Sequence, residues 1–330
     1  MSARHLLTNS RLVAFQRCAR AHDYRYEQGI TPTAAAPALV FGTAVHAALE
    51  AFWRGWQRGG FGATEAALDA LNEHPLDAET LVRARVMVGA YCARYTGFAA
   101  RCTVIEVERE FRAPIVNPDT GGVVPGWELA GKLDALVRLP DGRVAIVEHK
   151  TAGSDYRTRL TLDAQIGIYF DGAESLGHQP EVCLYDVLVK PSLDRLLATP
   201  EDARRYKKDG TLYANQRAED EPLGAFAERL FAAIEANPDR YLVQAEIHRT
   251  DAERDACRRD VLATVRAIEL ARRTRYAPRS AQACFAHGRC AYLAACLAPG
   301  EANNPAAFRR LPTIHPELNQ QPTNHGDDCE

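Results

Sequence analysis

The stretch Gly131-Lys-Leu-Asp-Ala-Leu-Val-Arg-Leu-Pro-Asp-Gly-Arg-Val-Ala-Ile-Val-Glu-His-Lys150 predicts two β-strands joined by a tight turn. Pro140-Asp141-Gly142 separates two apolar runs that contain β-branched residues. Proline presets the first turn dihedral, and glycine accepts the left-handed conformation that a three-residue hairpin loop requires. The stretch is therefore typical of a β-hairpin.

The register of this hairpin decides where its charged residues lie. A three-residue loop pairs Leu136 with Ile146 and places Asp134 opposite Glu148. Because side chains alternate along a strand, both carboxylates and the Lys150 ammonium then share one face. Opposed residues have Cβ atoms roughly 4.5–5.5 Å apart, and like charges that close raise one pKa unless a cation lies between them. The register therefore predicts a divalent-metal site in a hairpin that is apolar on both faces.

Two other interpretations of the hairpin are open at this point. Acidic residues near strand ends are common on surface hairpins, where water solvates them. A two-residue Asp-Gly loop would also shift the register and misalign the two carboxylates. The rest of the chain has to decide between these interpretations.

Length and composition set limits on the class of protein. The chain has 330 residues, which is enough for one large domain or two small ones. Its 46% hydrophobic residues are enough for a sizeable core. No apolar run approaches the ~20 residues of a membrane span, and residues 1–10 lack the apolar core of a signal peptide. We therefore expect a cytoplasmic protein with no membrane partner. Disulfides are rare in the cytoplasm, so nine cysteines favour metal or cluster ligands for some of them.

Charge limits how the chain can contact nucleic acid. The formal net charge is −3, which excludes a basic protein that coats DNA. Any such contact requires a local patch, and residues 249–279 contain nine arginines and five acidic residues, a local charge of +4. A solvated helix face explains this stretch equally well.

The remaining sequence alternates between helical and strand patterns. We expect a short helix with Ser10 as its candidate N-cap, followed by an aromatic-rich stretch as far as Glu27. Further helices are expected over 41–56, 78–100, 160–174, 223–236 and 252–273, strands over 104–111, 181–190 and 241–248, and a Pro/Asn/Gly loop over 114–126. With the hairpin, they predict an α/β fold with a central mixed sheet flanked by helices. We expect one domain at 1–298, with a helical insertion at about 50–100 and an excursion at about 192–222, and a flexible tail at 299–330.

Four further features contain residues that suit a site. His46 lies in an apolar helix on the same side as Gly42 and Glu50, where a single histidine is more often a core residue than a ligand. Gln165 and Tyr169 lie four apart on one helix face, and alone would be surface residues. Cys18 alone would be a small buried hydrophobe. Three later cysteines, separated by five residues each, form a stronger ligand pattern: Cys284, Cys290 and Cys296.

Taken together, these motifs resemble the PD-(D/E)XK nuclease superfamily, specifically its RecB-like and AddB-like branch with an iron–sulfur cluster. That branch includes phage exonucleases and CRISPR adaptation nucleases, and the similarity spans residues 10–296. The matching positions are His46, Asp134, Glu148-His149-Lys150 as E-x-K, Gln165 with Tyr169 as Q-x-x-x-Y, and Cys18, Cys284, Cys290 and Cys296. Two positions depart from the pattern. Many relatives have C-x-x-C as the first C-terminal pair, and many have Tyr or Phe where this chain has His149.

The resemblance implies a restriction-endonuclease-like core whose helical N- and C-terminal parts are joined by a cysteine cluster. It implies an Mg²⁺- or Mn²⁺-dependent deoxyribonuclease, expected to be an exonuclease, in DNA processing, recombination or repair. In such a site the metal polarises the phosphate and lowers the pKa of a bound water. The resemblance assigns the metal to His46, Asp134 and Glu148, the attacking water to Lys150, and support of the site to Gln165 and Tyr169.

The resemblance also implies cofactors and partners. Cys18, Cys284, Cys290 and Cys296 would hold a [4Fe–4S] cluster, with Zn²⁺ as the competing occupant. The expected substrate is DNA with a single-stranded end, and a helicase or recombination partner would be a separate protein because the chain has no P-loop pattern. Two alternatives are a non-catalytic DNA-binding or adaptor module of the same fold and a metallohydrolase of small phosphate esters. The first predicts that a site residue is lost, yet all six are present.

Overall fold

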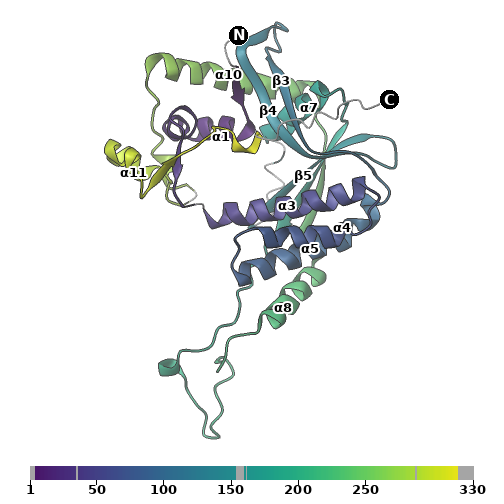
Figure 1. Ribbon diagram of the computed structural model, residues 1–330, viewed down its shortest axis with the longest axis vertical. Coiled ribbons are helices and arrows are strands. Elements are labelled where there is room, and N and C mark those ends of the chain that lie inside the picture. The colour runs from purple at the N-terminus through teal and green to yellow at the C-terminus, as the bar shows by residue number, and fades with distance from the viewer. Residues whose placement is uncertain (1–3, 35, 154–159, 161, 287, 319–330) are drawn as a thin grey trace, which may run out of the picture.

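A six-stranded mixed sheet forms the centre of the protein (Figure 1). The computed structural model describes residues 4–34, 36–153, 160, 162–286 and 288–318. The strand order is β1-β4-β5-β6-β7, with β3 paired to β4, and the pairs β1–β4 and β5–β6 are parallel. The strands are β1 (His5–Leu7), β3 (Thr103–Val116), β4 (Val123–Arg138), β5 (Val144–Ala152), β6 (Val182–Val189) and β7 (Leu242–Ile247). The predicted mixed α/β fold is confirmed.

The β4–β5 hairpin has the predicted register. Leu136 pairs with Ile146, and the Leu139 N–H donates to the Arg143 carbonyl at 2.9 Å across the three-residue loop. Gly142 has φ 95°, a conformation that favours glycine. The hairpin is buried on both faces, as predicted, by apolar residues with 0% exposure: Leu133, Ala135, Leu136, Val137, Ala145, Ile146 and Val147.

The sheet opens between β4 and β5 just beyond this hairpin. The β4–β5 ladder ends at the Ala135–Val147 pair, and β5 then continues beside β6, where Glu148 pairs with Tyr185. On the same edge of β4, β1 pairs only with residues 127–129. Within the described chain, residues 130–134 of β4 therefore have no strand partner on that edge. We call this opening the fork.

Helices cover both faces of the sheet (Figure 1). Successive side chains of β5 point to opposite faces, so His149 meets one layer and Glu148 meets the other. On the His149 side lie α3 (Pro37–Gln57), α4 (Ala63–Ala70), α5 (Ala78–Ala99) and α8 (Leu223–Ala236), and on the other lie α1 (Asn9–Arg17), α7 (Ala164–Ser175) and α10 (Asp251–Thr274). None of the described helices is long and apolar enough to cross a membrane.

Three expectations differ from the structure locally. The short N-terminal helix is α1, whose N-cap is Thr8 and not Ser10, and the aromatic-rich stretch that follows is also helical, as α2 (Ala19–His22) and the π-helix η1 (Asp23–Glu27). The predicted loop at 114–126 is mostly strand, because β3 and β4 pair as far as Val116–Val123. Proline at 114 is tolerated because β3 is an edge strand. The start of the helix predicted from 160 falls partly outside the described residues, and α7 begins at Ala164.

The excursion at 192–222 extends away from the body between β6 and α8 (Figure 1). It contains only one short 3₁₀ turn, η3 (Glu201–Ala203), and an isolated bridge between Tyr206 and Leu212. The predicted helical segment at about 50–100 contains the end of α3, then α4, η2 (Leu71–Glu73) and α5.

A segment near the N-terminus, residues 24–32, meets residues 292–310 in a second, smaller unit, which we call the terminal junction. Strand β2 (Ile30–Pro32) pairs with β8 (Phe308–Arg310), and a small core forms around Tyr24, Ile30, Ala295 and Phe308. The Tyr24 hydroxyl donates to the Ala295 carbonyl at 3.0 Å. The structure therefore differs from the predicted flexible tail over 299–318, since burial of Phe308 fixes this segment to the domain. The C-terminal segment also contains η4 (Gln282–Cys284), α11 (Leu293–Leu297), η5 (Pro299–Asn303) and η6 (Pro316–Leu318). The short helix α9 (Pro238–Tyr241) belongs to the main domain, where it contacts β7 and α8.

Candidate active site

The fork brings the six predicted site residues together from four elements. Strand β4 contributes Asp134, β5 contributes Glu148 and Lys150, α3 contributes His46, and α7 contributes Gln165 and Tyr169. Contacts connect them in two groups, one around each carboxylate. The ladder ends one pair before the expected Asp134–Glu148 pair, but the fork, α3 and α7 still place all six side chains in one region of the fold.

In the fork, the Asp134 side chain accepts a hydrogen bond that a paired strand would otherwise accept. Because β4 no longer pairs with β5 there, the His149 backbone N–H donates instead to Asp134 Oδ2, at 2.8 Å. The His46 Nδ1 atom lies 3.6 Å from the same oxygen. Burial alone would raise the Asp134 pKa, but His46 and His149 hold the pKa of this carboxyl well below its usual range. Asp134 is therefore an ionised carboxylate.

Glu148 is almost fully buried, at 1% exposure. Its Oε1 atom accepts from Gln165 Nε2 at 2.8 Å and from the Lys150 ammonium. Its Oε2 atom has no hydrogen-bond partner among the described residues. Burial, followed by the charge of Asp134, raises the pKa of Glu148 to about 7. A buried carboxylate oxygen without a partner is unfavourable, so this atom indicates a position for a cation.

Gln165 fixes the second carboxylate from α7. Asp163 caps this helix by accepting from the Gln165 backbone N–H at 2.9 Å. The Gln165 side-chain amide also donates to the Tyr169 hydroxyl at 2.7 Å, and its oxygen accepts from Asn9 Nδ2 at 3.3 Å. Burial and the nearby Glu148 raise the Tyr169 pKa well above 10, so Tyr169 stays protonated. The amide thereby connects α1, α7 and β5.

A third carboxylate lies beside the fork and was missed by the sequence analysis. Glu108 of β3 is 9% exposed and forms an ion pair with Lys132. Burial and the charge of Asp134 raise the Glu108 pKa. Its φ of 53° is unusual for a residue other than glycine. The run Glu106-Val-Glu-Arg-Glu110 contains several charges, and nothing in it distinguishes the buried one.

Four buried side chains behind Asp134 were also missed as a group: Trp53, Tyr91, His149 and Asp186. Asp186 is the only charged residue of strand β6, whose eight residues are all buried. A single carboxylate in an otherwise apolar strand is a signal that could have found it, because buried charges need partners. The other three gave no signal of their connection.

The donor set of the fork fits a hard divalent cation. Two carboxylates, one with an unpartnered oxygen, offer the ligands that such cations prefer, and Mg²⁺ takes one or two carboxylates while keeping several waters. The described residues contain no group of three or more His, Cys, Asp or Glu side chains already gathered around one metal position. Water or phosphate oxygens would therefore complete the coordination.

The four predicted cluster cysteines lie near one another at the terminal junction. Burial raises the pKa of the Cys296 thiol, and the nearby Cys18, Cys290 and Cys284 raise it further. Cys284 Sγ donates to the Ser280 carbonyl at 3.4 Å. The thiols fit a four-thiolate cofactor by type and neighbourhood, although no described set is gathered as a metal site. The other described cysteines lie elsewhere: Cys92, Cys102, Cys183 and Cys257.

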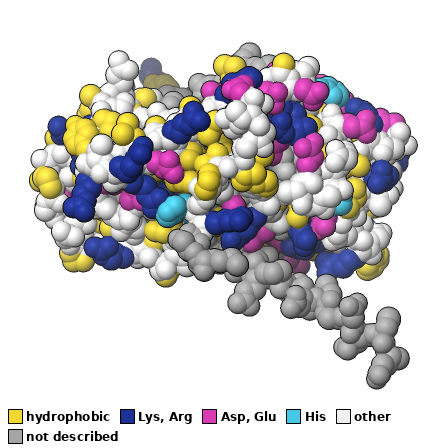
Figure 2. Space-filling model, turned by 90° about the horizontal axis from the view of Figure 1, so that it is seen from above, with side chains coloured by type: hydrophobic (Ala, Val, Ile, Leu, Met, Phe, Trp, Pro, Cys, Tyr) yellow, Lys and Arg dark blue, Asp and Glu magenta, His cyan; other side chains and the backbone are white. Residues whose placement is uncertain are grey.

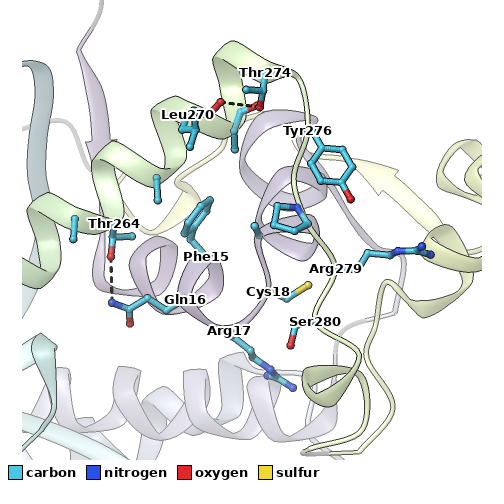
Figure 3. A pocket seen from close by; sticks show the side chains of 15 residues that line it. Phe15, Gln16, Arg17, Cys18, Thr264, Leu270, Thr274, Tyr276, Arg279 and Ser280 are labelled. Atoms are coloured by element: carbon cyan, nitrogen blue, oxygen red, sulfur yellow. Dashed lines mark hydrogen bonds between the residues drawn. The ribbon is translucent and has the colours of Figure 1, made fainter.

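Cys18 lies at a pocket between α1, α10 and the segment before Cys284 (Figure 3). The pocket has a volume of about 800 Å³ and a mainly apolar lining that includes Phe15 and Leu270. Gln16 Nε2 donates to Thr264 Oγ1 at 3.2 Å and connects the two helices. Arg17 and Arg279 also line it. Cys18 therefore borders a cavity and lies outside the main core.

The arginines of 249–279 do not form a simple basic patch. Four of the nine pair with acidic residues of other segments: Arg254 and Arg258 with Asp171, Arg259 with Asp119, and Arg272 with Glu27. Lys and Arg side chains are interspersed with acidic ones on the face seen from above (Figure 2). The interpretation of this stretch as an ion-paired helix face is favoured.

Comparison with known proteins identifies the family of the chain. The sequence model of the PD-(D/E)XK nuclease superfamily matches residues 7–297. No curated protein matches the chain. One matching solved structure is titled "Crystal structure of SSO0001"; the match has 16% sequence identity and a TM-score of 0.29 and covers 67% of this chain and 74% of that chain. The family match covers most of the chain, including the fork and the cysteines. The chain therefore belongs to the PD-(D/E)XK nuclease superfamily.

Proposed function

We propose that this protein is an Mg²⁺- or Mn²⁺-dependent deoxyribonuclease that hydrolyses phosphodiester bonds at the fork. The observation that carries the proposal is the buried Oε2 of Glu148, which has no hydrogen-bond partner among the described residues, close enough to Asp134 for the two charges to interact. Such a pair needs a cation, and the superfamily consists of nucleases that generally use divalent metals. An exonuclease of the RecB-like type is the finer form of this proposal.

The residues of the fork have separate roles in this mechanism. Asp134, Glu148 and His46 would hold the ion, which supplies Lewis-acid polarisation of the phosphate and a more acidic water. The Lys150 side chain is 29% exposed and contacts Glu148, so its ammonium can donate to the attacking water or to a phosphate oxygen. Gln165 donates to Glu148 Oε1 and thereby keeps Oε2 for the ion.

Two variants test the site directly. Asp134→Ala and Lys150→Ala should abolish Mg²⁺-dependent cleavage of end-labelled DNA, whereas Lys208→Ala, in the exposed excursion, should cleave like the wild type. Retained cleavage in both folded site variants would refute the assignment. Wild-type protein that cleaves linear but not covalently closed circular DNA supports an exonuclease, and nicking of the circle indicates an endonuclease.

The cysteines are proposed to hold a [4Fe–4S] cluster that joins the two ends of the chain. Support comes from the neighbourhood of Cys18, Cys284, Cys290 and Cys296 at the terminal junction. Protein purified anaerobically should be brown, with broad absorption near ~400 nm. It should contain about four irons per chain, as expected for one [4Fe–4S] cluster. Colourless protein with stoichiometric zinc would assign the site to Zn²⁺ instead.

The biological setting belongs to the same proposal. We infer a cytoplasmic enzyme of DNA processing, recombination or repair that acts on DNA with a single-stranded end, beside a separate helicase or recombination partner. Cleavage rates on single-stranded, blunt and tailed duplex substrates test the end preference. Equal rates on blunt and tailed duplexes would contradict it.

A further inference from the structure

A buried hydrogen-bond network lies behind Asp134, on the face of β5 opposite to Glu148. His149 follows Glu148 in the strand, so its side chain points toward α3 and α5. Its exposure is 2%, and its closest polar neighbours are Trp53 and Tyr91 from these helices. A polar ring in such a place is retained only if its nitrogens have partners.

Trp53 determines which nitrogen of His149 carries the proton. The Trp53 indole N–H lies 3.0 Å from His149 Nε2. An indole nitrogen can only donate, so Nε2 must accept and is unprotonated. The proton of the neutral imidazole is then on Nδ1, which lies 3.3 Å from Asp134 Oδ2. His149 therefore donates to Asp134.

Tyr91 does not compete with Trp53 as the hydrogen-bond donor to His149 Nε2. Its hydroxyl lies 3.2 Å from His149 Nε2 but donates its single proton to Asp186 Oδ2, at 2.7 Å. Gln244 Nε2 donates to the other Asp186 oxygen at 2.8 Å. Because the Tyr91 proton is used in the hydrogen bond to Asp186, Trp53 is the donor that fixes the His149 imidazole.

Asp134 Oδ2 thus receives two donors from one residue, the backbone N–H of His149 at 2.8 Å and its Nδ1–H. Two donors on one oxygen fix the rotation of the carboxylate. In the described part of the chain no hydrogen bond reaches the second oxygen, Oδ1, which remains available to a ligand at the fork. The network therefore sets the direction in which Asp134 presents Oδ1.

We propose that His149 is a positioning residue whose neutral imidazole, fixed in one tautomer by Trp53, directs Asp134 Oδ1 toward the divalent ion. The identity of the ion rests on the proposed function, and the positioning is a further property of the same site. Removing the outer partner of a metal ligand typically weakens metal affinity about 10–100-fold, and we expect that range here.

The experiment measures Mn²⁺ affinity by electron paramagnetic resonance, without DNA, alongside the thermal midpoint of each variant. His149→Phe should weaken Mn²⁺ binding about 10–100-fold. His149→Asn should restore binding to within about threefold, because its amide N–H takes the place of Nδ1–H. Trp53→Phe should weaken binding several-fold although the imidazole is kept. Trp56→Phe, on the same helix one turn away, is the matched control and should bind like the wild type.

Two results would overturn the proposal: wild-type affinity in His149→Phe, or equal weakness in His149→Asn and His149→Phe. If His149→Phe does not fold, the Mn²⁺ affinities of Trp53→Phe and Trp56→Phe are compared instead. Equal affinities of these two variants would also overturn the proposal. The proposed nuclease function is judged separately. Asp134-dependent Mn²⁺ binding without DNA cleavage would refute the nuclease and leave the role of His149 standing.

Discussion

Asp134 and Glu148 lie on adjacent strands of the main sheet, whereas Cys18 and Cys296 lie on short segments outside it. Backbone ladders through β3, β4, β5 and β6 fix the positions of the two carboxylates. Cys284 lies in a 3₁₀ turn of three residues and Cys296 in a helix of five. The fork is therefore held by the main core, and the terminal junction by a small satellite core.

This difference indicates a division of roles. Ligands on sheet strands are preorganised before an ion binds, because packing and outer hydrogen bonds fix their side chains. Four thiols on short segments gain their geometry when a metal or cluster binds, and that binding then contributes to folding. We expect substitutions at the fork to abolish chemistry with little loss of fold, and substitutions at the junction to do the reverse.

The largest expected effect is that of Glu148→Gln on the rate of cleavage. The amide cannot supply the anionic Oε2 that the proposed ion requires, so the single-turnover rate should fall roughly 10³-fold, as for loss of a principal electrostatic group. The measurement is cleavage of a labelled duplex at saturating Mn²⁺. Glu181→Gln, exposed just before β6, is the matched control. If the cleavage rate falls less than tenfold, the fork is not the catalytic site.

The sequence predicted the hairpin because its signals are local. The Pro140-Asp141-Gly142 loop fixes the register, and the register fixes which residues oppose each other. The fork itself was not predicted, because it arises where β1 and β5 share one edge of β4 without meeting. The long β3–β4 ribbon was missed for the same reason, since cross-strand pairing overrides the local loop preference of residues 114–126.

The hairpin register alone brought Asp134 and Glu148 together, but the other members of the candidate site could be assigned only through the resemblance of their motifs to a known family. His46 and Asp134 are far apart in sequence, and no spacing rule brings them together. The network of Trp53, His149 and Asp186 was missed because nothing in the sequence connects three residues of three different elements, although a lone carboxylate in the apolar strand β6 distinguishes Asp186. At the terminal junction, burial of Phe308 against Tyr24 and Ile30 outweighs the polar composition that suggested a tail.

The second expected effect concerns the stability of the metal-free protein. Burial and Asp134 raise the Glu148 pKa from its ordinary value of 4.5 to about 7. Between these values the folded protein keeps a proton that the unfolded chain releases, so the free energy of unfolding falls as pH rises through this range. The fall attributable to Glu148 is at most about 3 kcal/mol, from a shift of about 2.5 pKa units.

Urea unfolding in chelator at pH 5 and pH 8 measures this effect. Glu148→Gln carries no titrating carboxylate and should lose less stability over the interval than the wild type. The difference between the two proteins separates Glu148 from His46, whose raised pKa acts in the same direction above pH 6.5. If the free energy of unfolding changes equally between pH 5 and pH 8 in both proteins, Glu148 does not hold a proton at the fork in this range. Added Mn²⁺ should stabilise the wild type more at pH 8, where the proton no longer competes.

A smaller effect is expected when Gln165 is changed to Leu. This change removes the amide donor to Glu148 Oε1 and the connection to Asn9, while the two carboxylates remain. The cleavage rate should fall about tenfold, at the lower end of the range for outer-partner substitutions. Gln57→Leu is the control, because the Gln57 amide donates to the Ile105 carbonyl, away from the fork. Equal rates in the two variants would contradict the role assigned to α7.

The smallest expected effect on the rate belongs to Cys296→Ser. Its thiol lies with Cys18, Cys284 and Cys290, so the variant should lose the proposed cluster and its thermal midpoint should fall by about 5 °C or more. Below that midpoint its cleavage rate should stay within about threefold of the wild type, since the main sheet still holds the fork. Cys102→Ser, in the main body, should change neither quantity. If Cys296→Ser instead loses as much activity as Glu148→Gln while still folded, the junction forms part of the catalytic machinery, because a satellite core that only braces the chain cannot change the chemistry of a preorganised site.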